Sequence, residues 1–181
     1  MTKEVFISVD IEASGPVPGT YSMLALGACV VGNDAEQFYA ELRPINEACV
    51  PGAMAVVGKT IEEFRQAGRE PAEAMLEFGA WVRRVVDGGK AVFVGFNAAF
   101  DWSFVNWYFD TYQGKNPFGV GGLDIKSFYM GMSGCAWDET RSSRLPVKYR
   151  GESAHTHNAL SDAIEQAAIF EKMGRDAGVI R

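Results

Sequence analysis

The N-terminal stretch VFISVDIEASG, residues 5–15, constrains the fold more than any other part of the chain. It starts like a buried strand and ends in two acids, Asp10 and Glu12. Successive side chains of a strand point to opposite faces, so these two carboxylates share a face and repel each other unless a positive charge lies between them. A strand end that frays into solvent would tolerate both acids, and the rest of the chain has to decide between the two interpretations.

The segments that follow predict a mixed α/β architecture. A turn rich in proline and glycine (15–20) leads to a buried strand (21–31) and then to a third strand (36–42), which predicts an antiparallel meander. The later segments are a helix interrupted near Gly58 (51–64), a helix (70–86), an apolar strand (90–96), a helix (98–109), a loop (110–122), a short strand leading into a helical turn (123–132) and a last helix (159–173). This order predicts a mixed sheet with helices on its faces.

Length and composition narrow the class of protein. A chain of 181 residues with 48% hydrophobic and 12% aromatic residues predicts one soluble globular domain that spans residues 1–181. We expect a cytoplasmic protein, because no apolar run approaches the roughly 20 residues that span a bilayer, no signal peptide precedes the first strand, and the three cysteines include no C-x-x-C pair. The net charge of −6 argues against a general nucleic-acid-coating protein but allows an enzyme that binds a few phosphates.

Two further acids lie where later helices begin. In VGFNAAFDWSF, Asn97 is expected to cap a helix whose first turns hold Asp101, a position where the helix dipole favours an acid. In HTHNALSDAIEQAAIF, Asn158 is expected to cap the last helix, and Asp162 leans back toward the helix start that His157 precedes. The buried stripe predicted for this helix consists of Leu160, Ala163, Ile164 and Ala167. Each pattern alone is ordinary at a structural helix terminus.

Together, the three segments resemble the DEDDh family of 3′–5′ exonucleases, which includes polymerase proofreading subunits, RNase T and oligoribonuclease. The matching motifs are Asp-x-Glu in DIEASG, Asn-x-x-Phe-Asp in NAAFD and His-x-Ala-x-x-Asp in HNALSD. The residues that carry the resemblance are Asp10, Glu12, Asp101, His157 and Asp162. The likeness runs from about Val5 to Met173. The chain departs from the family at Ser14, where threonine is common, and at VVGKT (56–60), where many members have an hGI signature.

The resemblance implies an RNase H-like fold: a mixed five-stranded sheet, with an antiparallel meander of three strands plus two parallel strands, flanked by helices. It also implies two ions per active site, Mg²⁺ or Mn²⁺, with Asp10 between them, Glu12 and Asp162 completing the first and Asp101 helping to hold the second. His157 would be the general base. Crowded carboxylates raise one another's pKa, and hard divalent cations with oxygen ligands reverse this effect. On this interpretation, Asp10 and Glu12 share a face because they share an ion.

By the same resemblance, we expect a metal-dependent 3′–5′ exonuclease that releases nucleoside 5′-monophosphates from the 3′ ends of single-stranded DNA or RNA. The expected substrate contacts are the backbone donors of Ser14 and Gly15, the ring of Phe100, and a basic segment with Arg141, Arg144, Lys148 and Arg150. Core packing is the alternative for Phe100, and a solvated loop is the alternative for the basic segment.

Two functions of other classes stay open: a non-catalytic nucleic-acid-binding module on the same fold, and a phosphohydrolase of small nucleotides. The presence of all five catalytic positions argues against the first. The choice between DNA and RNA stays open as well, because no side chain visibly recognises a 2′-hydroxyl. Several family members are homodimers, and a homodimer is compatible with this chain, although the sequence shows no interface signature. No membrane partner is expected.

Overall fold

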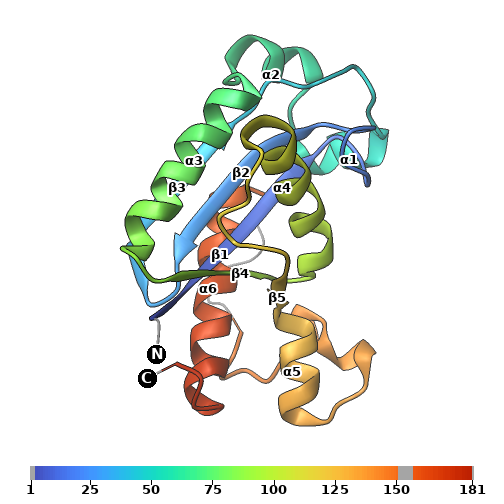
Figure 1. The fold of residues 1–181 in the computed structure, drawn as a ribbon. Helices are drawn as coiled ribbons and strands as arrows, with labels where there is room; N and C mark the ends of the chain where they lie inside the picture. The colour runs from blue at the N-terminus through green and yellow to red at the C-terminus, as the bar shows by residue number, and fades with distance from the viewer. Residues whose placement is uncertain (1–2, 151–156, 181) are drawn as a thin grey trace.

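The centre of the protein is a five-stranded sheet (Figure 1), seen in a computed structural model that describes residues 3–150 and 157–180. In chain order the strands are β1 (Glu4–Ala13), β2 (Met23–Val30), β3 (Asn33–Glu41), β4 (Lys90–Gly95) and β5 (Gly122–Asp124). They lie in the order β3-β2-β1-β4-β5. The first three strands pair antiparallel, and β4 and β5 extend the sheet parallel to β1. The predicted sheet, a meander of three strands plus two parallel strands, is confirmed.

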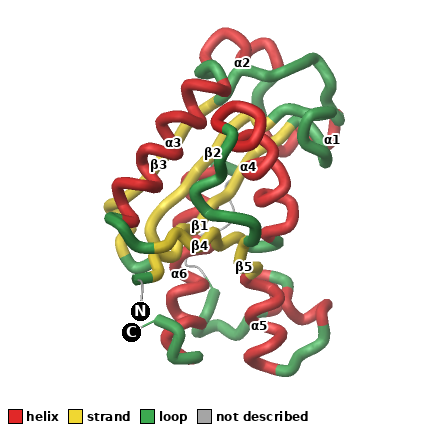
Figure 2. Tube along the Cα trace, in the orientation of Figure 1, coloured by secondary structure: helices red, strands yellow, loops and turns green. Residues whose placement is uncertain are grey.

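Helices cover both faces of the sheet (Figures 1 and 2). One face packs on α3 (Pro71–Val86) and α4 (Ala98–Gln113), and the other on α5 (Ile125–Ser133) and α6 (Ala159–Asp176). Strand β1 contributes to both layers because its side chains alternate. Ile7 and Val9 are fully buried with α3 and α4, whereas the ring of Phe6 lies 5.3 Å from that of Phe170 in α6, centroid to centroid. Asp10 and Glu12 therefore belong to the face that α6 covers.

Two short helices connect β3 to α3. Helix α1 (Pro51–Val57) ends at Gly58, whose φ of 74° is left-handed and suits glycine. Helix α2 (Ile61–Ala67) starts with a capping box in which Thr60 and Glu63 bond each other's backbone. The predicted interruption near Gly58 is confirmed.

Three helices extend further than the sequence predicted. Helix α4 continues through residues 110–113, because Tyr112 still packs on the core, and it ends at the left-handed Gly114. The predicted helical turn after β5 is the full helix α5. Helix α6 ends at Asp176, which accepts hydrogen bonds from Lys148 and Tyr149. The intervening segment forms two single-turn 3₁₀ helices, η1 (Trp137–Thr140) and η2 (Ser142–Arg144).

None of the helices within residues 3–150 and 157–180 combines the length and the apolar composition that a bilayer crossing requires.

Candidate active site

The carboxyl-terminal half of β1 carries Asp10 and Glu12 on the face that α6 covers. Asp10 lies opposite Gly27 of β2, and Glu12 lies opposite Ala25. A Cβ atom at Gly27 would come within 2.3 Å of the backbone of Ala159, the first residue of α6. Only glycine therefore lets the start of α6 rest directly on the sheet beside Asp10. Gly27 was missed by sequence reasoning, although a glycine inside a strand is a known sign of close backbone approach.

The opening turn of α6 brings a third acid and a histidine to Glu12. Asn158 caps the helix as predicted, since its side chain accepts a hydrogen bond from the Ser161 N–H at 3.1 Å. Glu12, His157 and Asp162 each offer one ligand atom, and these atoms all lie within 4.8 Å of one another. Asp162 is buried and His157 is exposed, so the group opens to solvent at the histidine. A cation could enter from that side.

Asp101 approaches the same place from the other face of the sheet's end. Its buried carboxylate accepts a hydrogen bond from the Ile11 N–H at 3.0 Å, between the two acids of β1. This bond ties the first turn of α4 to β1. Asp10 in turn accepts a hydrogen bond at 2.6 Å from the amide of Gln166, which lies one turn after Asp162 in α6. The three acid-bearing segments are thus joined by direct contacts.

The prediction that the Asn97 side chain caps α4 is wrong. Asn97 occupies the N-cap position with a left-handed φ of 71°, and its side chain makes no capping bond. The acceptor comes instead from the neighbouring strand, where one oxygen of Asp124 accepts from the Ala98 N–H at 2.8 Å. The other oxygen of Asp124 caps α5 through the Ser127 N–H at 2.7 Å. The adjacency of β4 and β5 supplies this cap, and local sequence does not reveal it.

Burial and mutual repulsion disfavour the charged forms of these acids. Burial is the main cause that raises the pKa of Asp10 well above its usual range, followed by the charges of Asp101, Glu12 and Asp162. Burial and the charge of Asp162 raise the pKa of Glu12 to about 7. The pKa of Asp101 is also raised by burial, against the opposing hydrogen bond from Ile11. In the described part of the chain, the charges that shift these pKa values are all negative. A positive charge bound among these acids would therefore stabilise their ionised forms.

A divalent cation fits this donor set. The ligand atoms come from carboxylates, with one imidazole at the open side, and the like charges that raise the carboxyl pKa values are those that a bound cation would offset. Oxygen-rich sites of this kind suit hard ions such as Mg²⁺ and Mn²⁺. The residues available to hold such ions are Asp10, Glu12, Asp101 and Asp162.

Ser14 and Gly15 follow β1 directly, but the donors of Ser14 are engaged within the protein. Its N–H donates to the Ser22 carbonyl at 2.9 Å and its hydroxyl donates to the Ala48 carbonyl at 2.8 Å. Gly15 packs so closely beneath the ring of Tyr21 that a Cβ atom would lie 2.4 Å from that ring. Ser14 therefore closes the turn after β1, and of the two expected donors only the Gly15 N–H stays a candidate.

Phe100 lies one residue before Asp101 at the edge of the core. Its ring lies 5.3 Å from that of the fully buried Phe104, centroid to centroid, and the side chain is half-buried. The position is compatible with both predictions for Phe100, packing at the core edge and contact with a nucleobase.

The basic side chains have partners of their own, and Lys148 lies far from the acids. Lys148 forms an ion pair with Asp176 at 2.6 Å, and Asp176 lies at the carboxyl end of α6. That end is fourteen residues, or about 21 Å at 1.5 Å per residue, from Asp162. The other basic side chains also have partners: Arg141 and Arg144 pair with Asp138, and Arg150 donates to the Leu145 carbonyl. His155, the alternative to His157 as a base, lies outside the described residues.

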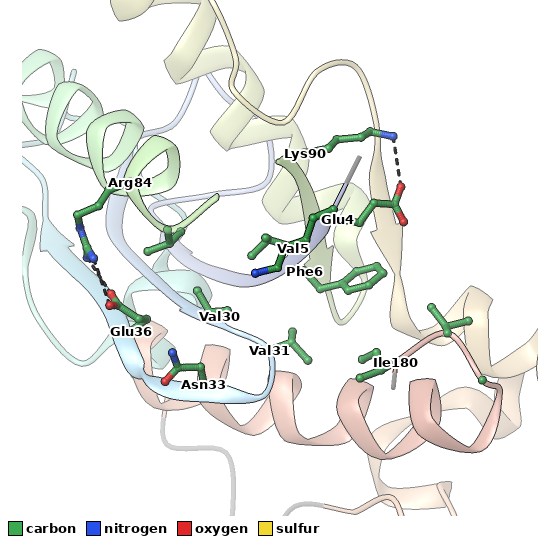
Figure 3. Close-up of a pocket in the computed structure, with 14 residues that line it drawn as sticks. Glu4, Val5, Phe6, Val30, Val31, Asn33, Glu36, Arg84, Lys90 and Ile180 are labelled. Carbon is green, nitrogen blue, oxygen red and sulfur yellow. Dashed lines mark hydrogen bonds and ion pairs between the residues drawn. The ribbon is translucent and has the colours of Figure 1, made fainter. Parts of the chain in front are cut away.

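A wide groove lies elsewhere on the protein (Figure 3). It has a volume of about 1300 Å³ and is lined by the start of β1, the end of β2 and the C-terminal residues 178–180. Ion pairs Arg84–Glu36 and Lys90–Glu4 lie on its rim. Glu4 precedes Asp10 by six residues of extended strand, about 20 Å at roughly 3.3 Å per residue. The groove is therefore at the opposite end of β1 from the acids.

Comparison with known proteins gives a close sequence relative and clear structural likenesses; no family model matches the chain. The 3′-5′ DNA exonuclease Cap18 of Escherichia coli is 49% identical over 169 residues, which cover 93% of this chain and 90% of the relative. The nuclease domain of 3′hExo, a DEDDh family member bound to rAMP, superposes with a TM-score of 0.77 at 15% identity and covers 98% of this chain and 94% of its own.

A second structural likeness is to the zinc-bound form of Escherichia coli ExoI in complex with single-stranded DNA. Its TM-score is 0.67 at 20% identity, over 97% of this chain and 41% of ExoI. At such identities the two solved structures show a shared fold, whereas the sequence relative at 49% identity shows a shared family.

Proposed function

The chain belongs to the DEDDh family of 3′–5′ exonucleases, and from that premise we propose that it removes nucleoside 5′-monophosphates one at a time from the 3′ end of single-stranded DNA. We also propose that residues 1–181 form one exonuclease domain. The choice of DNA is supported by the 49% identical relative, which is named a DNA exonuclease. The complex of ExoI with single-stranded DNA supports a single-stranded substrate.

The observation that carries the proposal is the convergence of Glu12, His157 and Asp162 within 4.8 Å, beside Asp10 and Asp101. The four carboxylates would hold two divalent ions, Mg²⁺ or Mn²⁺. A pair of such ions, when bound, activates a water and stabilises the leaving oxygen of an in-line phosphoryl displacement. The zinc ion in the ExoI structure supports a divalent metal in this fold.

The protein's own residues supply orientation and a proton acceptor. Asp101 is held by the Ile11 N–H and Asp10 by Gln166, so both carboxylates keep fixed directions before a substrate arrives. His157 takes the proton of the attacking water on a ring nitrogen, a role that histidine plays more often than any other side chain in general acid–base catalysis. Its exposure at the open side of the cluster allows water to reach it. The bond between phosphorus and the 3′-oxygen of the shortened strand breaks, that oxygen takes a proton from solvent, and the histidine ring returns its own proton to solvent.

The decisive assay uses matched single-stranded DNA and RNA of one sequence, labelled at either end, with Mn²⁺ or with EDTA. We expect the 5′-labelled DNA to shorten in single steps and the 3′-labelled DNA to release labelled mononucleotide at once. A block at the 3′ end should stop both. Faster degradation of the RNA would contradict the choice of DNA.

The same assay separates the functions of other classes. Retention of labelled DNA on the protein without any shortening would identify a non-catalytic binding module. Hydrolysis of free nucleotides with intact oligonucleotides would identify a small-nucleotide phosphohydrolase. Either result would overturn the proposed exonuclease.

A further inference from the structure

Gln166 is a buried polar residue in the middle of α6, on the helix face that rests on the sheet. It is 3% exposed, and its immediate neighbour Ala167 and the fully buried Phe170 on the same helix are apolar. An unbonded amide at such a position would be costly. Both ends of this amide are bonded: the carbonyl oxygen accepts from the Phe96 N–H at 2.8 Å, and the NH₂ group donates to Asp10 Oδ1 at 2.6 Å.

The chemistry of the two partners fixes which way the amide faces. A backbone N–H can only donate, so the oxygen of Gln166 has to face Phe96. The NH₂ group is then directed at Asp10, whose carboxylate can only accept when it is charged. The bond occupies one of about four lone-pair positions of that carboxylate and leaves the others free for a cation. Gln166 thus selects one rotation of the Asp10 carboxylate.

The same side chain connects the three segments that carry the acids. Asp10 lies on β1. Phe96 directly follows β4, just before the left-handed Asn97 and the helix of Asp101. Gln166 itself lies one turn after Asp162. Residues four apart on a helix share a face, so Gln166 and Asp162 are directed at the sheet together. A change at Gln166 would therefore act on the acids without removing any of them.

We propose that Gln166 is a positioning residue of this active site: it orients the Asp10 carboxylate for a divalent cation and fastens the end of β4 to α6. The proposal rests on the proposed metal-dependent function and names a residue that touches neither the substrate nor the cation. Groups that hold a metal ligand in place change metal affinity or activity by about 10–100-fold when they are lost.

Gln166→Met tests the proposal, because methionine has a similar length but bonds neither partner. In calorimetric titration of the metal-free protein with MnCl₂, in the absence of nucleic acid, we expect binding to be about 10–100-fold weaker than in the wild type. The Phe96 amide should also exchange its hydrogen faster, because it loses its acceptor. Gln166→Glu separates the two bonds: an oxygen still accepts from Phe96, whereas the donor to Asp10 is gone. It should keep the Phe96 amide protected and still bind Mn²⁺ more weakly.

Ile169→Ala is the matched control for a purely structural effect. Ile169 is buried on the same helix and contributes to the core with Phe170. Its truncation should lower the melting temperature by at least as much as Gln166→Met and leave Mn²⁺ affinity within about twofold of the wild type. Weaker Mn²⁺ binding in both variants in proportion to lost stability would overturn the positioning role.

The outcomes distinguish this inference from the function on which it rests. A wild-type protein that binds Mn²⁺ and degrades DNA, beside Gln166→Met and Gln166→Glu variants with unchanged Mn²⁺ affinity, overturns the role of Gln166 and leaves the exonuclease intact. A wild-type protein that binds no Mn²⁺ overturns the metal-dependent mechanism and the inference together.

Discussion

Gly27 of β2 and Ala159 of α6 are in backbone contact: a Cβ atom at position 27 would lie 2.3 Å from the Ala159 carbonyl. This contact lets the helix that carries Asp162 begin on the sheet itself, opposite Asp10. A single methyl group at Gly27 would therefore separate two of the acids that the proposed reaction requires.

Gly27→Ala should lower kcat strongly and the free energy of unfolding only moderately. The added methyl has to push the start of α6 away, and overpacking of this kind costs about 1–3 kcal/mol of unfolding free energy. A displacement near 1 Å at a catalytic group can cost about 10²-fold in turnover, which we expect in kcat for a 5′-labelled oligonucleotide. Gly131→Ala is the matched control, since beyond its chain neighbours and the backbone of its own helix nothing lies within 4 Å of the added carbon. Equal kcat values for the two variants would contradict the role of the contact.

Stability of the metal-free protein should fall as pH rises toward neutrality. The pKa of Glu12 is about 7 in the folded protein against 4.5 ordinarily, so the folded state binds the proton more tightly than the unfolded state. The stabilising contribution is fully present below pH 4.5 and is lost as pH rises to about 7. Melting temperatures in EDTA across this range should decline, and Glu12→Gln should flatten the decline. A melting temperature that rises with pH in EDTA would contradict the sign.

A divalent cation should reverse this trend. A ligand that binds only the folded state adds stability in proportion to the logarithm of its concentration above Kd, about 2.7 kcal/mol at a hundredfold excess. We expect the gain in melting temperature from Mg²⁺ or Mn²⁺ to grow as pH rises, because protons compete with the cation for these carboxylates. Asp10→Ala should lose this gain together with activity. Full activity in EDTA would refute the metal-dependent mechanism.

The sequence pattern was sufficient to predict the order of the helices and strands and to locate the three acidic motifs. Alternation in β1 placed Asp10 and Glu12 on one face, and the cap at Asn158 fixed the start of α6. These features are local, so the sequence contains them directly. The structure differs from the sequence-based expectation where a residue distant in sequence provides the contact. Asp124, for example, supplies the helix cap that Asn97 was expected to make.

The buried stripe of α6 is the clearest example. The apolar positions Leu160 and Ile164 were expected to face the core, but both are only partly buried, and Asp162 and Gln166 are buried in their place. The helix is rotated because its start lies on Gly27 and the Gln166 side chain bonds Asp10 of β1 and the Phe96 N–H just after β4. The four-residue spacing of Asp162 and Gln166 was the available signal, since it puts both on one face.

Removal of the basic side chain at position 148 should leave substrate binding unchanged. The Lys148 ammonium is paired with Asp176 at the end of α6 away from Asp162. We expect Lys148→Ala to retain the KM and the salt dependence of KM, because only a side chain that neutralises a substrate phosphate adds to that dependence. The variants Arg141→Ala and Arg144→Ala are the comparison for Lys148→Ala, because both arginines pair with Asp138, which neutralises part of their charge. A flatter salt dependence in Lys148→Ala would restore the basic segment as a substrate-binding surface.

His157→Ala should lower turnover by about 10²–10⁴-fold, the usual effect of losing a positioned general base. His157 lies within 4.8 Å of Glu12 and Asp162, close enough to act on a water held there, and it is exposed whereas Asp162 is buried. DNA binding measured with EDTA present should persist, because no carboxylate is removed. His155→Ala is the natural control, as it lacks the five-residue spacing to Asp162. Similar kinetics for the two histidine variants would mean that another group takes the proton, even in an active exonuclease.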